Sequence, residues 1–257
     1  MMKKEMLFAF AAFFFMSLSA ITGVYAGKEE EKIITISKDK MDVSGDKKDD
    51  TVYIKGVFYE EGAAFLKEIF LEVAASDGKT YKAELSGGYE PLLEFEDLNQ
   101  DNIRDIYISI PTGGSGGLSN YYLYTLRDFQ LTDLTVPGSL VINSQYENEY
   151  KATVSIQETG KSYFFDLRDR RKEYERLGLY INGKLSEPTE LIVNPYSTLK
   201  VTSVEGKKGL MGVQRISGAY NADTIAFVES FWLYEEGKWM LKNIKVMKMN
   251  SRGSSKN

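Results

Sequence analysis

The chain has 257 residues, a formal net charge of −5, no histidine and no cysteine. The two missing residue types exclude a Ser-His-Asp triad, a Cys-His dyad, histidine-ligated zinc, disulfide bonds and iron–sulfur ligation. The mildly acidic balance argues against a nucleic-acid interface. Hydrophobic residues at 43% and charged residues at 27% are typical of globular proteins, so the sequence predicts a folded chain.

The first 26 residues have the three parts of a signal peptide. Lysines at positions 3 and 4 precede an uncharged apolar stretch from Leu7 to Ala20, and Val24-Tyr25-Ala26 forms an A-x-A-like cleavage site. The alternative is an uncleaved anchor, because the apolar stretch of residues 6–23 is near the lower length limit for a membrane span. In both cases the body is expected outside the cytoplasm, and after cleavage no segment is expected to insert into a membrane.

Short apolar and aromatic runs, separated by turn residues, predict a mainly β fold of antiparallel strands. Isoleucines 106, 108 and 110 alternate with other residues, so we expect them on one face of a strand. Helix is expected only at 168–177 and as one turn at 60–66. The expected strands are 51–59, 68–75, 80–85, 92–98, 105–111, 120–126, 150–156, 162–167, 229–234 and 239–246, and the turn signals are 76–78, 87–88, 182–183 and 236–237.

A weak internal repeat suggests two related halves. Residues 92–134 and 199–244 share an order of strand, loop, strand, small-residue turn, aromatic strand, tight turn and strand. The alternative is that any two aromatic β meanders resemble each other at this level. We therefore expect a compact repeat-derived or propeller-like assembly with one or two short helices. Its expected parts are a signal peptide at 1–26, β halves at 27–137 and 138–249, and a disordered tail at 250–257.

Two aspartate-rich segments share the spacing D-x-[SN]-x-D-x-x-x-D, and each precedes a predicted strand. Ca²⁺ takes about 6–8 oxygen ligands, and such a loop can aim oxygens inward from positions 1, 3, 5 and 9 and a carbonyl from position 7. The predicted calcium ligands are Asp42, Ser44, Asp46, the Lys48 carbonyl and Asp50 in the first loop, and Asp97, Asn99, Asp101, the Ile103 carbonyl and Asp105 in the second.

The two loops are not equally good candidates. Position 6 favours a residue that tolerates positive φ, which Asn102 does better than Lys47. Residues 203–211 occupy the matching place in the second half, but Lys207 stands where the central acid would be. The alternative for every loop is a solvated turn, because Asp and Asn cap turns without a metal.

The segment LEFEDLNQDNIRDIYISIP, residues 93–111, resembles the repeat of FG-GAP and VCBS-type extracellular proteins, which also occurs in integrin α-chain propellers. The resemblance implies propeller-like blades, calcium on the loops and a role in adhesion or ligand binding. The sequence departs from that repeat at Gln100 and Asn102, where the repeat has glycine, and the Phe-Gly and Gly-Ala-Pro signatures are missing.

Two other patterns indicate structural roles more readily than ligand binding. The glycine-rich segment 113–117 is followed by an aromatic strand, so it reads as a loop between strands more readily than as a phosphate cradle. A sugar platform is possible but less favoured than core packing for a set of aromatic residues at strand spacing. The members of that set are Tyr121, Tyr122, Tyr124, Trp232 and Trp239.

Two functional hypotheses follow from these patterns. The first is an exported, non-enzymatic, calcium-stabilised β-rich protein that binds a ligand of the cell envelope or extracellular space, or serves as a structural surface or coat protein. The second is an extracellular hydrolase of polysaccharides or phosphoesters, with Glu94, Glu96 and Asp97 as loose candidates for paired carboxylates. The sequence names neither the ligand nor the oligomeric state.

Cleavage of the signal peptide can be checked directly by intact mass. We expect the exported protein to begin at Gly27, because Ala26 is the last residue of the cleavage pattern. Recovery of the full-length chain in the membrane fraction would instead indicate an uncleaved anchor.

Overall fold

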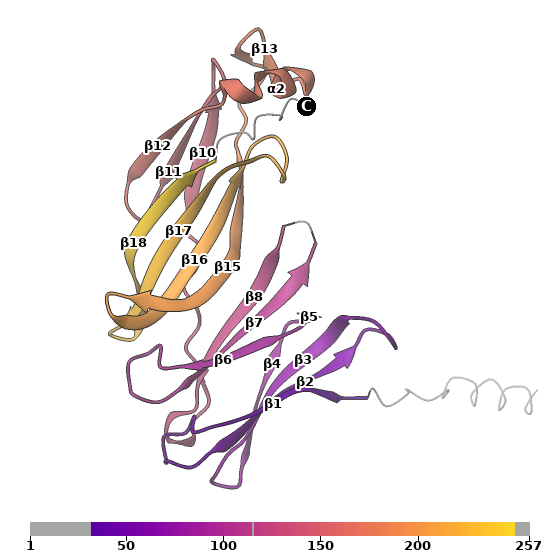
Figure 1. The fold of residues 1–257 in the computed structure, drawn as a ribbon, viewed down its shortest axis with the longest axis vertical. Helices are drawn as coiled ribbons and strands as arrows, with labels where there is room; N and C mark the ends of the chain where they lie inside the picture. Colours follow the sequence, from indigo (N-terminus) through magenta and orange to yellow (C-terminus); the bar gives the residue numbers. More distant parts are fainter. Residues whose placement is uncertain (1–31, 115, 250–257) are drawn as a thin grey trace, which may run out of the picture. The chain divides into compact units, whose positions relative to one another are not determined.

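The computed structural model describes residues 32–114 and 116–249, so the predicted signal peptide and tail lie outside the described residues. From Thr35 onward the described residues form one compact unit. The described residues form antiparallel sheets, one short α-helix and two 3₁₀ turns (Figure 1). Among them, no helix has the length and apolar character needed to cross a membrane.

Two open sheets form the first part of this unit. In one, the order is β1-β2-β3-β4, with β5 paired to β3, and in the other it is β6-β7-β8-β9. The strands are β1 (Ile34–Met41), β2 (Asp50–Phe58), β3 (Phe65–Ala74), β4 (Thr80–Leu85), β5 (Gly88–Tyr89), β6 (Leu92–Glu96), β7 (Asp105–Gly113), β8 (Leu118–Thr125) and β9 (Thr132–Asp133), with the 3₁₀ turn η1 (Arg127–Phe129) between β8 and β9.

The second part contains a three-stranded sheet, a short hairpin and a four-stranded sheet, with orders β10-β11-β12, β13-β14 and β15-β16-β17-β18. The 3₁₀ turn η2 (Arg168–Arg170) and helix α2 (Arg171–Arg176) follow β12. The strands are β10 (Ile142–Glu147), β11 (Lys151–Ile156), β12 (Lys161–Asp166), β13 (Tyr180–Ile181), β14 (Lys184–Leu185), β15 (Ile192–Val204), β16 (Lys207–Ser217), β17 (Thr224–Glu235) and β18 (Lys238–Lys248).

The prediction of a mainly antiparallel β fold with a short helix is confirmed, and the propeller-like alternative is wrong, since the described strands form no propeller and no closed sheet. The turns at 182–183 and 236–237 are confirmed as two-residue hairpin turns with positive φ at both positions. The helical turn expected at 60–66 is absent from the described chain. That segment connects β2 to β3, and Phe65 begins β3.

Side chains of β7 alternate between the two faces of its sheet, so the strand contributes to two buried clusters. Ile106, Ile108 and Ile110 lie in one buried cluster with residues of β2 and β3, as expected from their spacing. Tyr107 points to the opposite face and joins a second cluster, where its hydroxyl donates a 2.6 Å hydrogen bond to the carbonyl of Leu199. The whole strand is therefore held from both sides.

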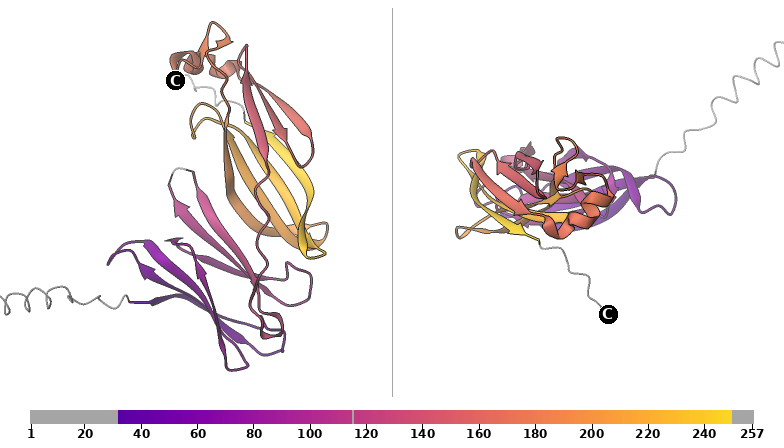
Figure 2. Two further views of the ribbon diagram at one scale, coloured as in Figure 1. Left: turned by 180° about the vertical axis from the view of Figure 1, so that it is seen from behind. Right: turned by 90° about the horizontal axis from the view of Figure 1, so that it is seen from above.

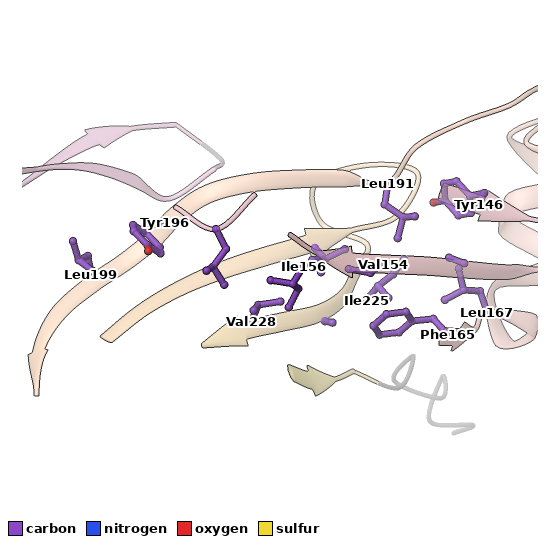
Figure 3. Packing of buried hydrophobic residues seen from close by; sticks show 14 of the residues in the cluster. Tyr146, Val154, Ile156, Phe165, Leu167, Leu191, Tyr196, Leu199, Ile225 and Val228 are labelled. Atoms are coloured by element: carbon purple, nitrogen blue, oxygen red, sulfur yellow. The ribbon is translucent and has the colours of Figure 1, made fainter. Parts of the chain in front are cut away.

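The second core lies between the three-stranded and four-stranded sheets. Strands β10–β12 lie over one face of β15–β18 in both orientations of the ribbon (Figure 2). Figure 3 shows Val154 and Ile156 of β11 and Phe165 of β12 pointing toward Ile225 and Val228. All five side chains are at most 5% exposed, so this packing removes a continuous apolar surface from water.

A glycine in β16 permits one close contact in this core. A Cβ atom added to Gly212 would overlap the ring of Tyr196, which crosses the strand at that point. The Tyr196 hydroxyl donates to the carbonyl of Gly138 at 2.8 Å. Glycine is therefore required at position 212 by the approach of an aromatic ring.

We expect Gly212→Ala to lower the free energy of unfolding by about 1–3 kcal/mol, because overpacking in a core forces side chains or backbone to move. Gly138→Ala is the matched control. It has open space around the added methyl group, so its effect should lie within about 0.5 kcal/mol. Chemical denaturation of both variants measures the difference, and equal stabilities would contradict this role of Gly212.

Candidate functional site: two aspartate loops

The two aspartate loops, residues 42–50 and 97–105, are closed by the same hydrogen bonds. In the first, Oδ2 of Asp50 accepts the N–H groups of Val43 and Ser44 at 3.0 and 2.9 Å. In the second, Oδ2 of Asp105 accepts the N–H groups of Leu98 and Asn99 at 2.9 and 3.0 Å. Each closing aspartate begins a strand, β2 or β7, and is fully buried.

The rest of each loop also matches. Asp42 accepts the N–H of Lys47 at 2.9 Å, and Asp97 accepts the N–H of Asn102 at 3.0 Å. Lys47 and Asn102 both have φ of 69°, so the preference for Asn102 over Lys47 at this position did not decide the conformation. Gly45 and Gln100 correspond in the same way, with φ of 83° and 65°.

The two loops touch each other. A Cβ atom on Gly45 would lie 2.6 Å from Cδ1 of Ile103, so the Ile103 side chain covers the first loop where it has no side chain of its own. The N–H of Ile103 donates to Oδ1 of Asp101 at 2.9 Å, just as Lys48 donates to Asp46. The second loop therefore packs against the first at Gly45.

The loops differ in the groups that donate hydrogen bonds to their carboxylates. In the first, Ser76 from the β3–β4 turn donates its N–H to Oδ1 of Asp50 at 2.8 Å and its hydroxyl to Oδ2 of Asp46 at 2.7 Å. Both bonds come from one residue, and that residue closes the first loop. The hydroxyl of Ser44, another predicted ligand, is buried without a hydrogen-bond partner.

In the second loop, Oδ1 of Asp105 is buried and has no hydrogen-bond partner. Burial raises the pKa of Asp105 to about 6; its bonds from Leu98 and Asn99 act against this shift, whereas the charges of Asp101 and Asp97 add to it. The carboxylate therefore lies close to two other carboxylates in a place with little water.

Other groups already contact Asp101. Its Oδ2 accepts a hydrogen bond from Nδ2 of Asn99 at 3.1 Å. The same oxygen forms a long ion pair with Nη1 of Arg127 at 3.4 Å, and the guanidinium is half-exposed. Within the described ranges, no three Asp or Glu side chains are arranged as a group that could hold a metal ion. The second loop thus has the oxygens for a cation, but not in a converged arrangement.

The place in the second half that matched these loops by sequence has another structure. Residues 203–211 form the end of β15, a two-residue turn at Glu205 and Gly206, and the start of β16. Lys208 pairs with Glu96 at 2.8 Å, and its carbonyl accepts the side chain of Gln100 at 2.9 Å. This hairpin therefore makes contacts that hold the second loop in place.

The remaining sequence candidates have structural surroundings. Tyr121 stacks on Tyr107 in one core, while Tyr122 and Tyr124 belong to the other, so they do not share a face. Trp232 is 8% exposed in the core, and Trp239 packs edge-on against Tyr234. The described glycines at 113, 114, 116 and 117 lie at the end of β7 and in its connection to β8, as expected.

The loose carboxylate candidates each lie against groups of the protein itself. Glu96 is bonded to Arg104 at 3.1 Å and to Lys208, and Asp97 accepts N–H groups of its own loop. Glu94 pairs across the sheet with Tyr107. Asp105, whose pKa is raised, is fully buried.

Sequence patterns did not indicate a buried ionic network centred on Arg170. Its Nε donates to Oδ1 of Asp223 at 2.9 Å, and the Tyr174 hydroxyl donates to Oδ2 of the same carboxylate at 2.5 Å. The side chains of Arg170 and Asp223 are only 8% and 9% exposed. The charged run at 168–177 predicted a short helix. The partners Arg170 and Asp223 are 53 positions apart in the sequence, so no local pattern could indicate their pairing.

Comparison with known proteins identifies the family. The chain is 30% identical over 210 residues to "Uncharacterized protein YybI" of Bacillus subtilis (strain 168), covering 77% of this chain and 79% of that protein. The chain belongs to the YybI family. Residues 140–247 match the model of the YybI C-terminal domain, and no solved structure matches.

The family relation corrects the resemblance to FG-GAP and VCBS repeats, which is wrong. The similarity was confined to one loop and one strand, and the sheets around them are not propeller blades. The prediction of calcium binding is consequently supported only by the chemistry of the loop residues.

The raised pKa of Asp105 predicts a pH dependence in the presence of a chelator. The native state takes up a proton near pH 6, whereas the unfolded chain does so near the ordinary value of 3.8. Stability should therefore fall as pH rises from about 4 to 6, and the loss should persist above pH 6. Asp105→Asn should remove a penalty on the order of 1–3 kcal/mol at pH 7.5 and none at pH 4.

The matched control is Asp50→Asn in the first loop. There the new amide would face an N–H donor, because both oxygens of Asp50 accept backbone N–H groups. This variant should be less stable than the native protein by about 1–3 kcal/mol at pH 7.5. Urea denaturation at several pH values measures both variants, and a destabilised Asp105→Asn protein at pH 7.5 would contradict the assignment.

Proposed function

We propose that the protein is an exported, non-enzymatic, β-rich structural or binding protein of the cell envelope or extracellular space, stabilised by Ca²⁺ at its second aspartate loop. The observation that carries the calcium part is the buried, partnerless Oδ1 of Asp105 beside the charges of Asp97 and Asp101. A buried charged oxygen without a partner is costly, and a cation would supply the missing partner.

The chemistry of the loop favours Ca²⁺ over other ions. The available groups are carboxylates, an amide and backbone carbonyls, which are hard oxygen donors. Ca²⁺ accepts irregular geometry, whereas Mg²⁺ demands near-octahedral coordination. Binding requires Asp101 to exchange its contacts with Asn99 and Arg127 for the ion, so the affinity should be modest.

The first loop is a poorer site for the same ion. Ser76 donates to both Asp50 and Asp46, and a cation between these carboxylates would have to displace two short hydrogen bonds. We therefore propose one occupied loop, with the first loop closed by protein groups.

The non-enzymatic part rests on residue types and on the placement of the carboxylates. The chain has no histidine and no cysteine, and Glu96 and Asp97 are engaged in bonds that hold the second loop. A screen of polysaccharides and phosphoesters should show no turnover. Turnover that is lost in Glu94→Gln or Glu96→Gln would favour the hydrolase alternative.

We also propose that the fold is derived from a repeat. The support is the shared hydrogen-bond pattern of the two aspartate loops, each of which connects the first two strands of a sheet. The four-stranded sheets β6–β9 and β15–β18 have the same meander order, as the comparison of 92–134 with 199–244 suggested, but a two-residue turn replaces the loop in the latter.

Thermal unfolding of chelator-treated protein, with and without millimolar Ca²⁺, tests the calcium proposal. Ca²⁺ should raise the Tm of the native protein, because a ligand that binds only the folded state stabilises it. Asp101→Asn should abolish the increase, while the matched variant Asp46→Asn should retain most of it. An equal increase in all three proteins, or none in the native protein, would contradict calcium at the second loop.

A further inference from the structure

Arg127 is a cationic side chain that already lies at the second aspartate loop. It begins η1, after β8, and its Nη1 is 3.4 Å from Oδ2 of Asp101. Its Nε is 3.5 Å from Oδ2 of the next residue, Asp128. Strong charge-assisted hydrogen bonds are about 2.7–2.9 Å long, so both contacts are weak. The guanidinium is also 55% exposed, and it is therefore loosely held between two carboxylates.

The backbone that carries Arg127 is firmly held, in contrast to its side chain. Leu126 is fully buried, and Phe129 packs against the same cluster. The N–H of Asp128 donates to the carbonyl of Ser44 at 3.2 Å, which joins η1 to the first loop. Asp128 and Phe129 have φ of 52° and 60°, an unfavourable conformation that persists only where the surroundings impose it. The Arg127 side chain can therefore change partners while its backbone stays in place.

The guanidinium neutralises the second loop incompletely. The charges of Asp97 and Asp101 both act on Asp105, so three carboxylates lie close together. Arg127 pairs with Asp101, the carboxylate of the three that is partly exposed at 13%, while Oδ1 of the buried Asp105 still has no hydrogen-bond partner. A Ca²⁺ ion carries no side chain and takes oxygens from several carboxylates at once. The ion therefore satisfies a group that the guanidinium leaves without a partner.

We propose that Arg127 is a built-in competitor that lowers the affinity of the second loop for Ca²⁺, a regulatory role that rests on the calcium site proposed above. In the metal-free protein the guanidinium occupies the carboxylate of Asp101. When the ion binds, the guanidinium leaves Asp101 and keeps the exposed carboxylate of Asp128 as its partner. The loop therefore fills only at high ion concentrations, such as the range of about 10⁻⁴–10⁻³ M in which extracellular calcium modules bind.

A purely structural Arg127 would behave differently. If its guanidinium held Asp101 in the position that the ion needs, removal of the guanidinium would weaken Ca²⁺ binding. Competition predicts the opposite, because the ion then meets a carboxylate that has lost its competing partner. The sign of the change in Kd therefore distinguishes the two roles.

Calorimetric titration of chelator-treated protein with Ca²⁺ at physiological salt tests the proposal. Arg127→Gln should bind Ca²⁺ about three- to tenfold more tightly than the native protein, because the ion no longer displaces an exposed ion pair or meets a positive charge. Arg127→Lys keeps the charge, so its Kd should stay within about twofold of the native value. The matched control is Lys79→Gln, which removes an exposed lysine that pairs with Asp77 at 3.2 Å in the β3–β4 turn. It should bind Ca²⁺ as the native protein does.

A thermal melt of each variant verifies folding. Unchanged or weaker binding by Arg127→Gln, with binding by the native protein intact, would overturn the competitor role and leave the calcium site standing. Equal tightening in Lys79→Gln would also overturn it, because the effect would then follow net charge alone. Binding by Arg127→Gln but not by the native protein would support the competitor role and contradict the proposed function. Binding by none of the proteins would overturn both.

Discussion

A buried carboxylate at the start of a central strand is the constraint on which the first part of the structure depends. Asp50 and Asp105 each fold the preceding loop back by accepting two backbone N–H groups. Each carboxylate fixes where its strand begins, and therefore which residues of β2 and β7 face the core. A charge removed from water in this way is costly unless all its oxygens find donors.

The two loops meet this cost differently, and the difference links structure to function. In the first loop Ser76 donates from within the chain, so both oxygens of the closing carboxylate, Asp50, have donors. The second loop lacks an equivalent donor for Oδ1 of Asp105. The nearby guanidinium of Arg127 pairs with Asp101 and stays half-exposed. The same backbone conformation is thus a closed structural turn in the first loop and a candidate ion site in the second.

Much of the fold could be predicted from the sequence because its signals are local. Alternation in Ile106, Ile108 and Ile110 and the Asn182-Gly183 turn depend only on neighbouring residues, and both predictions are confirmed. The strands β15 and β16 were expected only through the comparison of 92–134 with 199–244 and not from their own pattern, since glycines such as Gly209 and Gly212 weaken that pattern. Those glycines make room for the Trp232 carbonyl and the Tyr196 ring, which approach from distant parts of the chain.

For the candidate sites too, local patterns in the sequence located the segments but not the distant residues that complete them. Spacing alone located both aspartate loops, but it could not reveal that Ser76 completes one of them, because Ser76 lies 26 residues from Asp50. Helical propensity located residues 168–177, but the burial of Arg170 depends on Asp223 and on the end of β18. A partial motif match also misled the family assignment, since a twenty-residue loop and strand carry little information about the sheets around them.

Calorimetric titration of the chelator-treated mature chain with Ca²⁺ tests the central claim most directly, because it counts sites. One saturable site, with a Kd of about 10⁻⁵–10⁻³ M, is the predicted result. Two sites would contradict the closure of the first loop by Ser76. An absence of binding would show that both aspartate loops are metal-free turns and that the buried oxygen of Asp105 is accommodated by a proton instead.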